Sequence, residues 1–318
     1  MPSLEDAAGI AVEKCMGLKS GETCLVITDE PCREVGYALW EAARWLRSEA
    51  TLLEIIPRDR NGQEPPPGVA EFMRTFDVIL CPTSMSLTHT QARKNACNSG
   101  ARIATLPGVT VDMMERTLNA DYDGIRRRSE KMAGILTAGS EAHLTTPGGT
   151  DLRFLIRGRE GYADTGIVHK RGESTNLPAG EAYLAPLEGE TEGTLVIDGA
   201  MAGVGVIRSE PIRVTVKEGY AVELAGGEAA RKLEELIKPL GKPARNIAEL
   251  GIGANEKAIL TGNILEDEKV IGTVHVAIGD NKSMGGTVSV ESHLDGILLK
   301  PTLLIDGNAV MRDGEIVV

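Results

Sequence analysis

The chain has 318 residues, of which 42% are hydrophobic and 25% are charged, and its formal net charge at pH 7 is -12. The length suffices for one large or two moderate domains, and the composition is typical of a globular protein and excludes a disordered one. The acidic balance argues against nucleic acid and anionic membranes as partners, because phosphate surfaces bind basic faces. A small peptide or another small molecule, and divalent cations, stay open as ligands.

The cysteines and the N-terminus predict where the protein works. All five cysteines lie in the first third of the chain and form no Cys-x-x-Cys pair, so we expect reduced thiols in a cytoplasmic protein. The first residues, Met1–Asp6, lack a basic region followed by an apolar core, and we expect no secretory signal. No apolar run approaches the roughly 20 residues that span a bilayer, so we predict no membrane segment.

The first part of the chain alternates between segments of helical spacing and short, continuous apolar runs. The predicted helices are 4–18, 34–48, 69–76, 88–99 and 111–134, and the predicted strands are 23–28, 51–56, 77–81 and 101–106. Continuous apolar runs are typical of strands that are buried on both faces of a parallel sheet. We therefore predict the α/β class, with residues 1–137 forming a Rossmann-like, doubly wound, mostly parallel sheet domain. No GxGxxG follows the first predicted strand and the sequence shows no P-loop motif, so nucleotide binding is not supported.

The composition shifts near Thr137, where glycine becomes dense and the strand-like segments become short. We expect strands at 152–156, 194–197, 204–206, 212–216 and 220–224, and one helix at 227–238. A domain boundary at 134–140 follows, and residues 138–318 are predicted to form a β-rich α+β domain that binds metal.

The metal prediction starts from residues 272–299. Two apolar runs, 273–278 and 287–294, flank a glycine-containing loop, and each carries one of only five histidines in the chain. His293 and Asp295 are two residues apart, so in a strand they point to the same face, with Glu291 beside them. Imidazole and carboxylate together suit zinc, iron or manganese.

Four short motifs occur in an order that resembles the M29 metallo-aminopeptidases, the aminopeptidase T group. They are Asn176-Leu177-Pro178-Ala179-Gly180-Glu181, Glu249-Leu250-Gly251, His275-Val276-Ala277-Ile278-Gly279 and Ser292-His293-Leu294-Asp295. In that family two glutamates, two histidines and an aspartate bind a pair of divalent metals. The resemblance therefore implies Glu181, Glu249, His275, His293 and Asp295 as metal ligands, and it implies a homodimer.

The leading functional prediction is a metal-dependent aminopeptidase that removes N-terminal residues from peptides. Two ions of Zn, Mn or Co would activate a water molecule and polarise the scissile carbonyl. The general base is open between Glu249 and Glu268. The tyrosine that the family has seven residues after its first metal histidine is Lys282 here, and this lysine could stabilise the developing oxyanion.

Two other functions stay open. The 2,5-dihydroxypyridine dioxygenases resemble the M29 proteins but hold one Fe(II) through two histidines and an aspartate, which His275, His293 and Asp295 would supply. Glu181 and Glu249 as additional ligands favour the two-metal aminopeptidase, so the ring-cleaving dioxygenase ranks second. In the third hypothesis the metal is purely structural. His89, at the mouth of the first sheet, either begins a helix or faces the site.

Overall fold

The computed structural model describes residues 3–318, which fold into two compact units. Unit 1 comprises the chain up to Arg126 and the later segment Asp164–Ala179, and unit 2 comprises Arg127–Ala163 and Gly180–Val318. This division differs from the single boundary expected at 134–140. The physical reason is that the chain returns to unit 1 after residue 163 and adds one more strand to its sheet.

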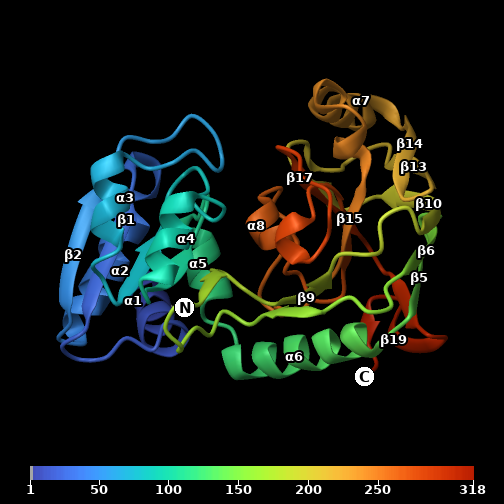
Figure 1. Cartoon of the computed structure of the whole chain (residues 1–318). Helices are drawn as coiled ribbons and strands as arrows, with labels where there is room; N and C mark the ends of the chain where they lie inside the picture. The colour runs from blue at the N-terminus through green and yellow to red at the C-terminus, as the bar shows by residue number, and fades with distance from the viewer. Residues whose placement is uncertain (1–2) are drawn as a thin grey trace. The chain divides into compact units, whose positions relative to one another are not determined.

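Unit 1 is built on a five-stranded sheet in the order β2-β1-β3-β4-β8, in which every pairing is parallel. Its strands β2 and β1 are drawn in blue in Figure 1. The strands are β1 (Thr23–Thr28), β2 (Glu49–Glu54), β3 (Val78–Cys81), β4 (Arg102–Thr105) and β8 (Ser174–Asn176). Every residue of β3 and β4 is buried, as expected for strands covered on both faces. The predicted α/β class with an N-terminal parallel sheet is confirmed.

The helices of this part of the chain follow the predicted order with one difference. They are α1 (Leu4–Gly9), which a further helical segment continues to Cys15, α2 (Arg33–Trp45), α3 (Pro67–Met73), α4 (Gln91–Asn98), α5 (Val111–Thr117) and α6 (Tyr122–Ala138). The single helix expected over 111–134 is two helices. Its interruption coincides with Asn119, whose side-chain amide donates to the Glu115 carbonyl at 2.8 Å, a local bond of the kind that competes with helix continuation.

Unit 2 is β-rich, as predicted, and contains two sheets whose central strands pair antiparallel. The eight-stranded sheet has the order β14-β13-β10-β6-β5-β18-β19-β20, and the seven-stranded sheet has the order β12-β11-β17-β16-β15-β9-β7. The strands of the first are β5 (Glu141–Thr145), β6 (Asp151–Leu155), β10 (Thr191–Ile197), β13 (Ile212–Lys217), β14 (Tyr220–Ala225), β18 (Thr302–Ile305), β19 (Asn308–Arg312) and β20 (Glu315–Ile316). Those of the second are β7 (Tyr162–Asp164), β9 (Glu181–Leu184), β11 (Ala200–Met201), β12 (Gly205–Val206), β15 (Ile247–Gly253), β16 (Val274–Gly279) and β17 (His293–Leu298).

The two sheets share one hydrophobic core. Even-numbered side chains of β15 and β16, among them Leu250, Val274 and Val276, belong to the same buried cluster as Leu144 and Phe154 of the eight-stranded sheet. Alternate residues of a strand point to opposite faces, so the odd-numbered residues of β16, and those of β15 from Glu249 onward, lie on the face away from this core. Ile247 lies before a register shift and belongs to the core. Two helices complete unit 2: α7 (Gly227–Ile237), which confirms the helix expected there, and α8 (Ile264–Asp267).

Two expectations about the chain's environment can be compared with the structure. All five cysteines are free and buried, and burial raises the pKa of the Cys24 and Cys81 thiols to about 12, which makes them poor nucleophiles. Across residues 3–318, no helix combines the length and the apolar character needed to cross a membrane.

Candidate metal centre

Four neighbouring strands bring the predicted ligands onto one face of the seven-stranded sheet. β9 pairs with β15, β15 with β16, and β16 with β17, all antiparallel. Glu249 lies opposite Ala277, which in turn lies opposite Asp295, so this row crosses three strands in register. Side chains in one cross-strand row share a face, and the face used here is the one away from the core. It carries all five predicted ligands: Glu181, Glu249, His275, His293 and Asp295.

Glycines make room on this face. A Cβ added to Gly251 would lie 1.9 Å from His275 Nε2, so the imidazole occupies the space in which a side chain at 251 would stand. A Cβ on Gly253 would lie 2.1 Å from the Val270 carbonyl oxygen, where the connection between β15 and β16 passes close to the sheet. The glycine of the Glu-Leu-Gly motif therefore has a packing reason: any larger residue there displaces a candidate ligand.

Glu249 lies between the two histidines. Its Oε1 is 3.2 Å from His275 Nε2, and its Oε2 is 3.0 Å from His293 Nε2. Asp295 Oδ1 is 3.4 Å from His293 Nε2, and Glu181 Oε2 is 3.3 Å from His275 Nε2. Two groups of three potential ligands result, and they share Glu249: one is Glu181, Glu249 and His275, and the other is Glu249, His293 and Asp295. The ligand atoms of each group lie within 4.8 Å of one another.

Hydrogen bonds and burial prepare these side chains for a cation. His293 Nδ1 lies 2.7 Å from the Asp280 carbonyl oxygen, which can only accept, so Nδ1 carries the proton and Nε2 faces the carboxylates. Across the described residues, the buried Glu181 Oε2 makes no well-aligned hydrogen bond, and His275 Nε2 lies 3.3 Å from it. A buried, incompletely paired carboxylate oxygen, among other carboxylates and imidazoles, fits a divalent metal ion.

The pKa values of the cluster reflect its negative charge. Burial alone would lower the pKa of His275 and His293, but their hydrogen bonds and attraction to Glu181, Glu249 and Asp295 outweigh it and raise both well above 6.5. Burial alone would raise the pKa of Glu249, yet the bonds to the two histidines lower it to about 2. A metal needs neutral imidazoles, so a metal ion and protons compete for this site.

A lysine that the sequence analysis missed lies against the same cluster. The Lys269 side chain is fully buried, and its ammonium donates to Glu181 Oε1 and to Glu268 Oε1, each at 2.6 Å. Burial raises the pKa of Glu268 to about 8, with the positive charge of Lys269 opposing the increase. In the sequence Lys269 follows an acidic run and resembles any solvent-exposed lysine; only the fold of the β15–β16 connection buries it.

Two predicted features fall outside the cluster. The apolar run 287–294 lies mostly outside a strand: β17 begins at His293, and residues 280–292 form a loop that the buried Asn281 holds in place. Its side-chain amide donates to Glu188 Oε1 at 3.0 Å, and its Oδ1 accepts from the Val288 backbone N–H. Lys282 and Glu291 are both exposed on this loop, so Glu291 does not share the strand face of His293. The oxyanion role of Lys282 stays a prediction.

His89 belongs to unit 1 and is exposed, directly before Thr90, which caps α4 by accepting from the Arg93 backbone N–H. Its position thus agrees with the simpler of the two alternatives, a residue at a helix start. The other two histidines have structural partners: His143 Nε2 lies 2.8 Å from Asp151 Oδ1, and His169 Nε2 lies 2.9 Å from a backbone carbonyl oxygen.

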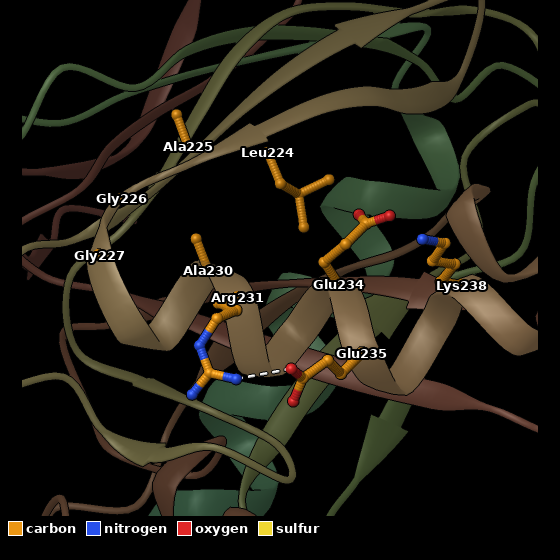
Figure 2. A pocket seen from close by; sticks show the side chains of 9 residues that line it. All are labelled: Leu224, Ala225, Gly226, Gly227, Ala230, Arg231, Glu234, Glu235 and Lys238. Carbon is orange, nitrogen blue, oxygen red and sulfur yellow. Dashed lines mark hydrogen bonds and ion pairs between the residues drawn. The ribbon is translucent and has the colours of Figure 1, made fainter.

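A separate pocket of about 340 Å³ lies between α7 and β14 (Figure 2). Its walls include Leu224 and Ala230, and Arg231 and Glu235 form an ion pair of 2.6 Å at its edge. None of its lining residues belongs to either group of potential ligands. This pocket and the sheet face that carries the five predicted ligands, called the metal-ligand face below, are therefore different places in unit 2.

The chain was compared with known proteins. The 2,5-dihydroxypyridine 5,6-dioxygenase of Pseudomonas putida is 24% identical over 262 residues, which cover 77% of this chain and 72% of that protein. Among solved structures, 2,5-dihydroxypyridine dioxygenase from P. putida KT2440 aligns with a TM-score of 0.87 at 19% identity, over 99% of this chain and 97% of that one. Wild-type AmpT from Thermus thermophilus aligns with a TM-score of 0.72 at 16% identity, over 99% of both chains.

At such identities the solved structures show a common fold, which includes both relatives that the sequence motifs resemble. The family comparison goes further, because a model described as NicX, 2,5-dihydroxypyridine 5,6-dioxygenase, matches residues 11–318. This match extends over both units and the entire metal-ligand face, and it supports an enzyme. The chain therefore belongs to the NicX family.

Proposed function

We propose that this protein is a mononuclear non-heme iron dioxygenase that cleaves the ring of a small hydroxylated heteroaromatic compound of the 2,5-dihydroxypyridine type. The observation that carries the proposal is the match of residues 11–318 to the NicX family model. It supports this function better than the aminopeptidase that the sequence motifs favoured.

The donor set of the metal-ligand face is compatible with iron. Non-heme Fe(II) oxygenases use two imidazoles and one carboxylate and keep coordination positions open. Here His293 and Asp295 would hold the ion together with Glu249, which lies between the two imidazoles, and His275 Nε2, 3.2 Å from Glu249 Oε1, is the second imidazole beside this group. When bound, Fe(II) supplies the redox chemistry that dioxygen needs to react with an aromatic ring.

The chain's own residues orient ligands and manage protons. The Asp280 carbonyl fixes the His293 ring with Nε2 directed at Glu249 and Asp295. A ring hydroxyl loses its proton more readily beside a base whose pKa is near the working pH. Glu249, with a pKa of about 2, is too weak a base, whereas Glu268, with a pKa of about 8, can hold or release a proton near neutrality. By this criterion Glu268 suits an acid–base role better than Glu249 does.

The direct test is oxygen uptake. The full chain, stripped of metal and reconstituted with Fe(II) without air, is mixed with 2,5-dihydroxypyridine in aerated buffer. We expect oxygen consumption together with loss of the ring absorbance. His293→Ala is the inactive control, and Lys217→Ala, a change at an exposed residue of β13, is the matched control that keeps activity. Absence of oxygen uptake in iron-loaded, folded protein would contradict the proposal.

A second candidate is the metal-dependent aminopeptidase, and one observation favours it. Glu249 is shared by two groups of three potential ligands, as expected for a carboxylate that bridges two metals in a hydrolase. Hydrolysis of aminoacyl p-nitroanilides by protein loaded with Zn, Mn or Co, without oxygen uptake, would establish it. The homodimer and the cytoplasmic location stay predictions under either function.

A further inference from the structure

The two groups of potential ligands differ in the cation beside them. Lys269 donates to Glu181 Oε1 at 2.6 Å, so its ammonium lies directly against the group formed by Glu181, Glu249 and His275. One of the two carboxylate oxygens of Glu181 is thereby already used. The group formed by Glu249, His293 and Asp295 has the three donors that a first metal ion needs, and each of its carboxylates has an oxygen within 3.4 Å of His293 Nε2.

Lys269 is held firmly in this position. Its side chain has no exposed surface. Its backbone carbonyl accepts from Asn255 N–H at 2.8 Å, and its backbone N–H donates to the Glu266 carbonyl at 2.9 Å. A second carboxylate, Glu268, binds the same ammonium. A lysine fixed by its backbone and by two carboxylates cannot move aside at little cost when a metal ion approaches, because both carboxylates would lose their partner inside the protein.

We propose that Lys269 takes the place of a second metal ion: its ammonium neutralises Glu181 and limits the centre to one divalent cation, held by the group that contains His293. An ammonium and a divalent ion that share one carboxylate repel each other, and in a buried site this repulsion is weakly screened. The inference rests on the proposed function, because a mononuclear centre is what separates the dioxygenase from the two-metal aminopeptidase.

Metal stoichiometry tests the inference without any assay of activity. Metal-free full-length protein is titrated with Mn²⁺ by calorimetry, and bound Mn is measured by elemental analysis after desalting. Wild-type protein should bind one equivalent. Lys269→Met keeps most of the side-chain length but removes the charge and frees Glu181, so this variant should bind two equivalents.

Three further variants serve as controls for the metal titration. Lys282→Met, which removes an exposed lysine from the same unit, should stay at one equivalent. Lys269→Arg keeps a cation and should also stay at one. The double variant Lys269→Met with Glu181→Gln should return to one, because the additional site loses a carboxylate. Two equivalents in this double variant would place the new site elsewhere and overturn the assignment.

The outcomes separate this inference from the proposed function. Two equivalents in wild-type protein would overturn both. One equivalent in wild-type and in folded Lys269→Met would overturn only the role of Lys269. If Lys269→Met does not fold, Lys269→Gln, which keeps hydrogen-bond donors, replaces it. If neither variant folds, Glu181→Gln in the wild-type background decides: the inference expects one equivalent still, and loss of that ion would overturn it.

Discussion

The five-stranded sheet of unit 1 and the seven-stranded sheet of unit 2 both contain strands with every residue buried. They differ in the chemical character of the buried side chains. In β3 and β4 both faces are mainly apolar. In β15 and β16 one face is apolar, and the other carries Glu249 and His275 beside glycines. Buried ionisable groups are costly unless they are paired or bind a metal. On the second face imidazoles and carboxylates pair with one another and form a donor set that suits a cation, whereas the first face contributes apolar burial.

The largest expected effect comes from removing ligands on the charged face. His293→Ala and Asp295→Ala should each lower the rate of oxygen uptake by about 100-fold or more. Each should also lower metal affinity, because each removes a candidate metal ligand. Elemental analysis and the oxygen assay measure both. Unchanged metal content in both variants would mean that the metal binds elsewhere.

Gly251→Ala tests whether the glycine makes room for His275. The added Cβ would stand 1.9 Å from His275 Nε2, so the ring must move, and metal affinity should fall about 10- to 100-fold. Gly134→Ala, in α6, is the matched control: a Cβ there meets nothing within 4 Å, and alanine favours a helix by about 1 kcal/mol. Equal affinity in the two variants would remove the packing explanation.

Ile79→Ala tests the apolar sheet of unit 1 in the same way. Ile79 is fully buried in β3, and its truncation should destabilise the protein by about 2–5 kcal/mol through lost burial and a cavity. Because the change lies in the apolar sheet of unit 1, metal stoichiometry should not change. Denaturant unfolding gives the first quantity, and metal titration of folded protein gives the second. A lost metal ion would mean that the two sheets are not separate in function.

The smallest expected effect is the pH dependence of the metal-free protein. Raised folded pKa values of His275, His293 and Glu268 stabilise the fold below the unfolded values, and this stabilisation is lost as pH rises through the folded values. The thermal midpoint should therefore fall between about pH 6 and pH 9. The lowered pKa of Glu249 changes the stability of the fold only as pH falls from 4.5 towards about 2, outside this window.

Metal loading provides the control for the pH prediction. A bound ion keeps the imidazoles deprotonated, so the metal-loaded protein should lose much less stability over the same window. Thermal unfolding with and without Mn²⁺ measures the difference. A midpoint of the metal-free protein that rises with pH would contradict the assigned protonation states.

Much of this arrangement was predictable because strands and ligand spacing are local in the sequence. The apolar run of β1 was predicted at both ends, and the alternation in β16 separates Val274 and Val276 from His275. The two-residue spacing of His293 and Asp295 likewise required only a strand. The complete set of five candidate ligands needed more than such patterns, because it was implied by the resemblance to the M29 metallo-aminopeptidases.

The remainder depends on long-range contacts that no local pattern encodes. The return of the chain to unit 1 through β8 depends on pairing between residues 103–105 and 174–176. The start of β17 depends on a loop that is fixed through Glu188, about 90 residues earlier. Lys269 is adjacent to Glu268 in sequence, but its ammonium also donates to Glu181, 88 residues away.

Elemental analysis of the protein purified without added metal or chelator tests the central claim most directly. The account predicts one iron per chain, bound on the face shared by His275, His293 and Asp295 and lost when His293 is replaced. Two zinc or manganese ions per chain would contradict it, because they would mean that Glu181 and Glu249 hold a second metal despite Lys269.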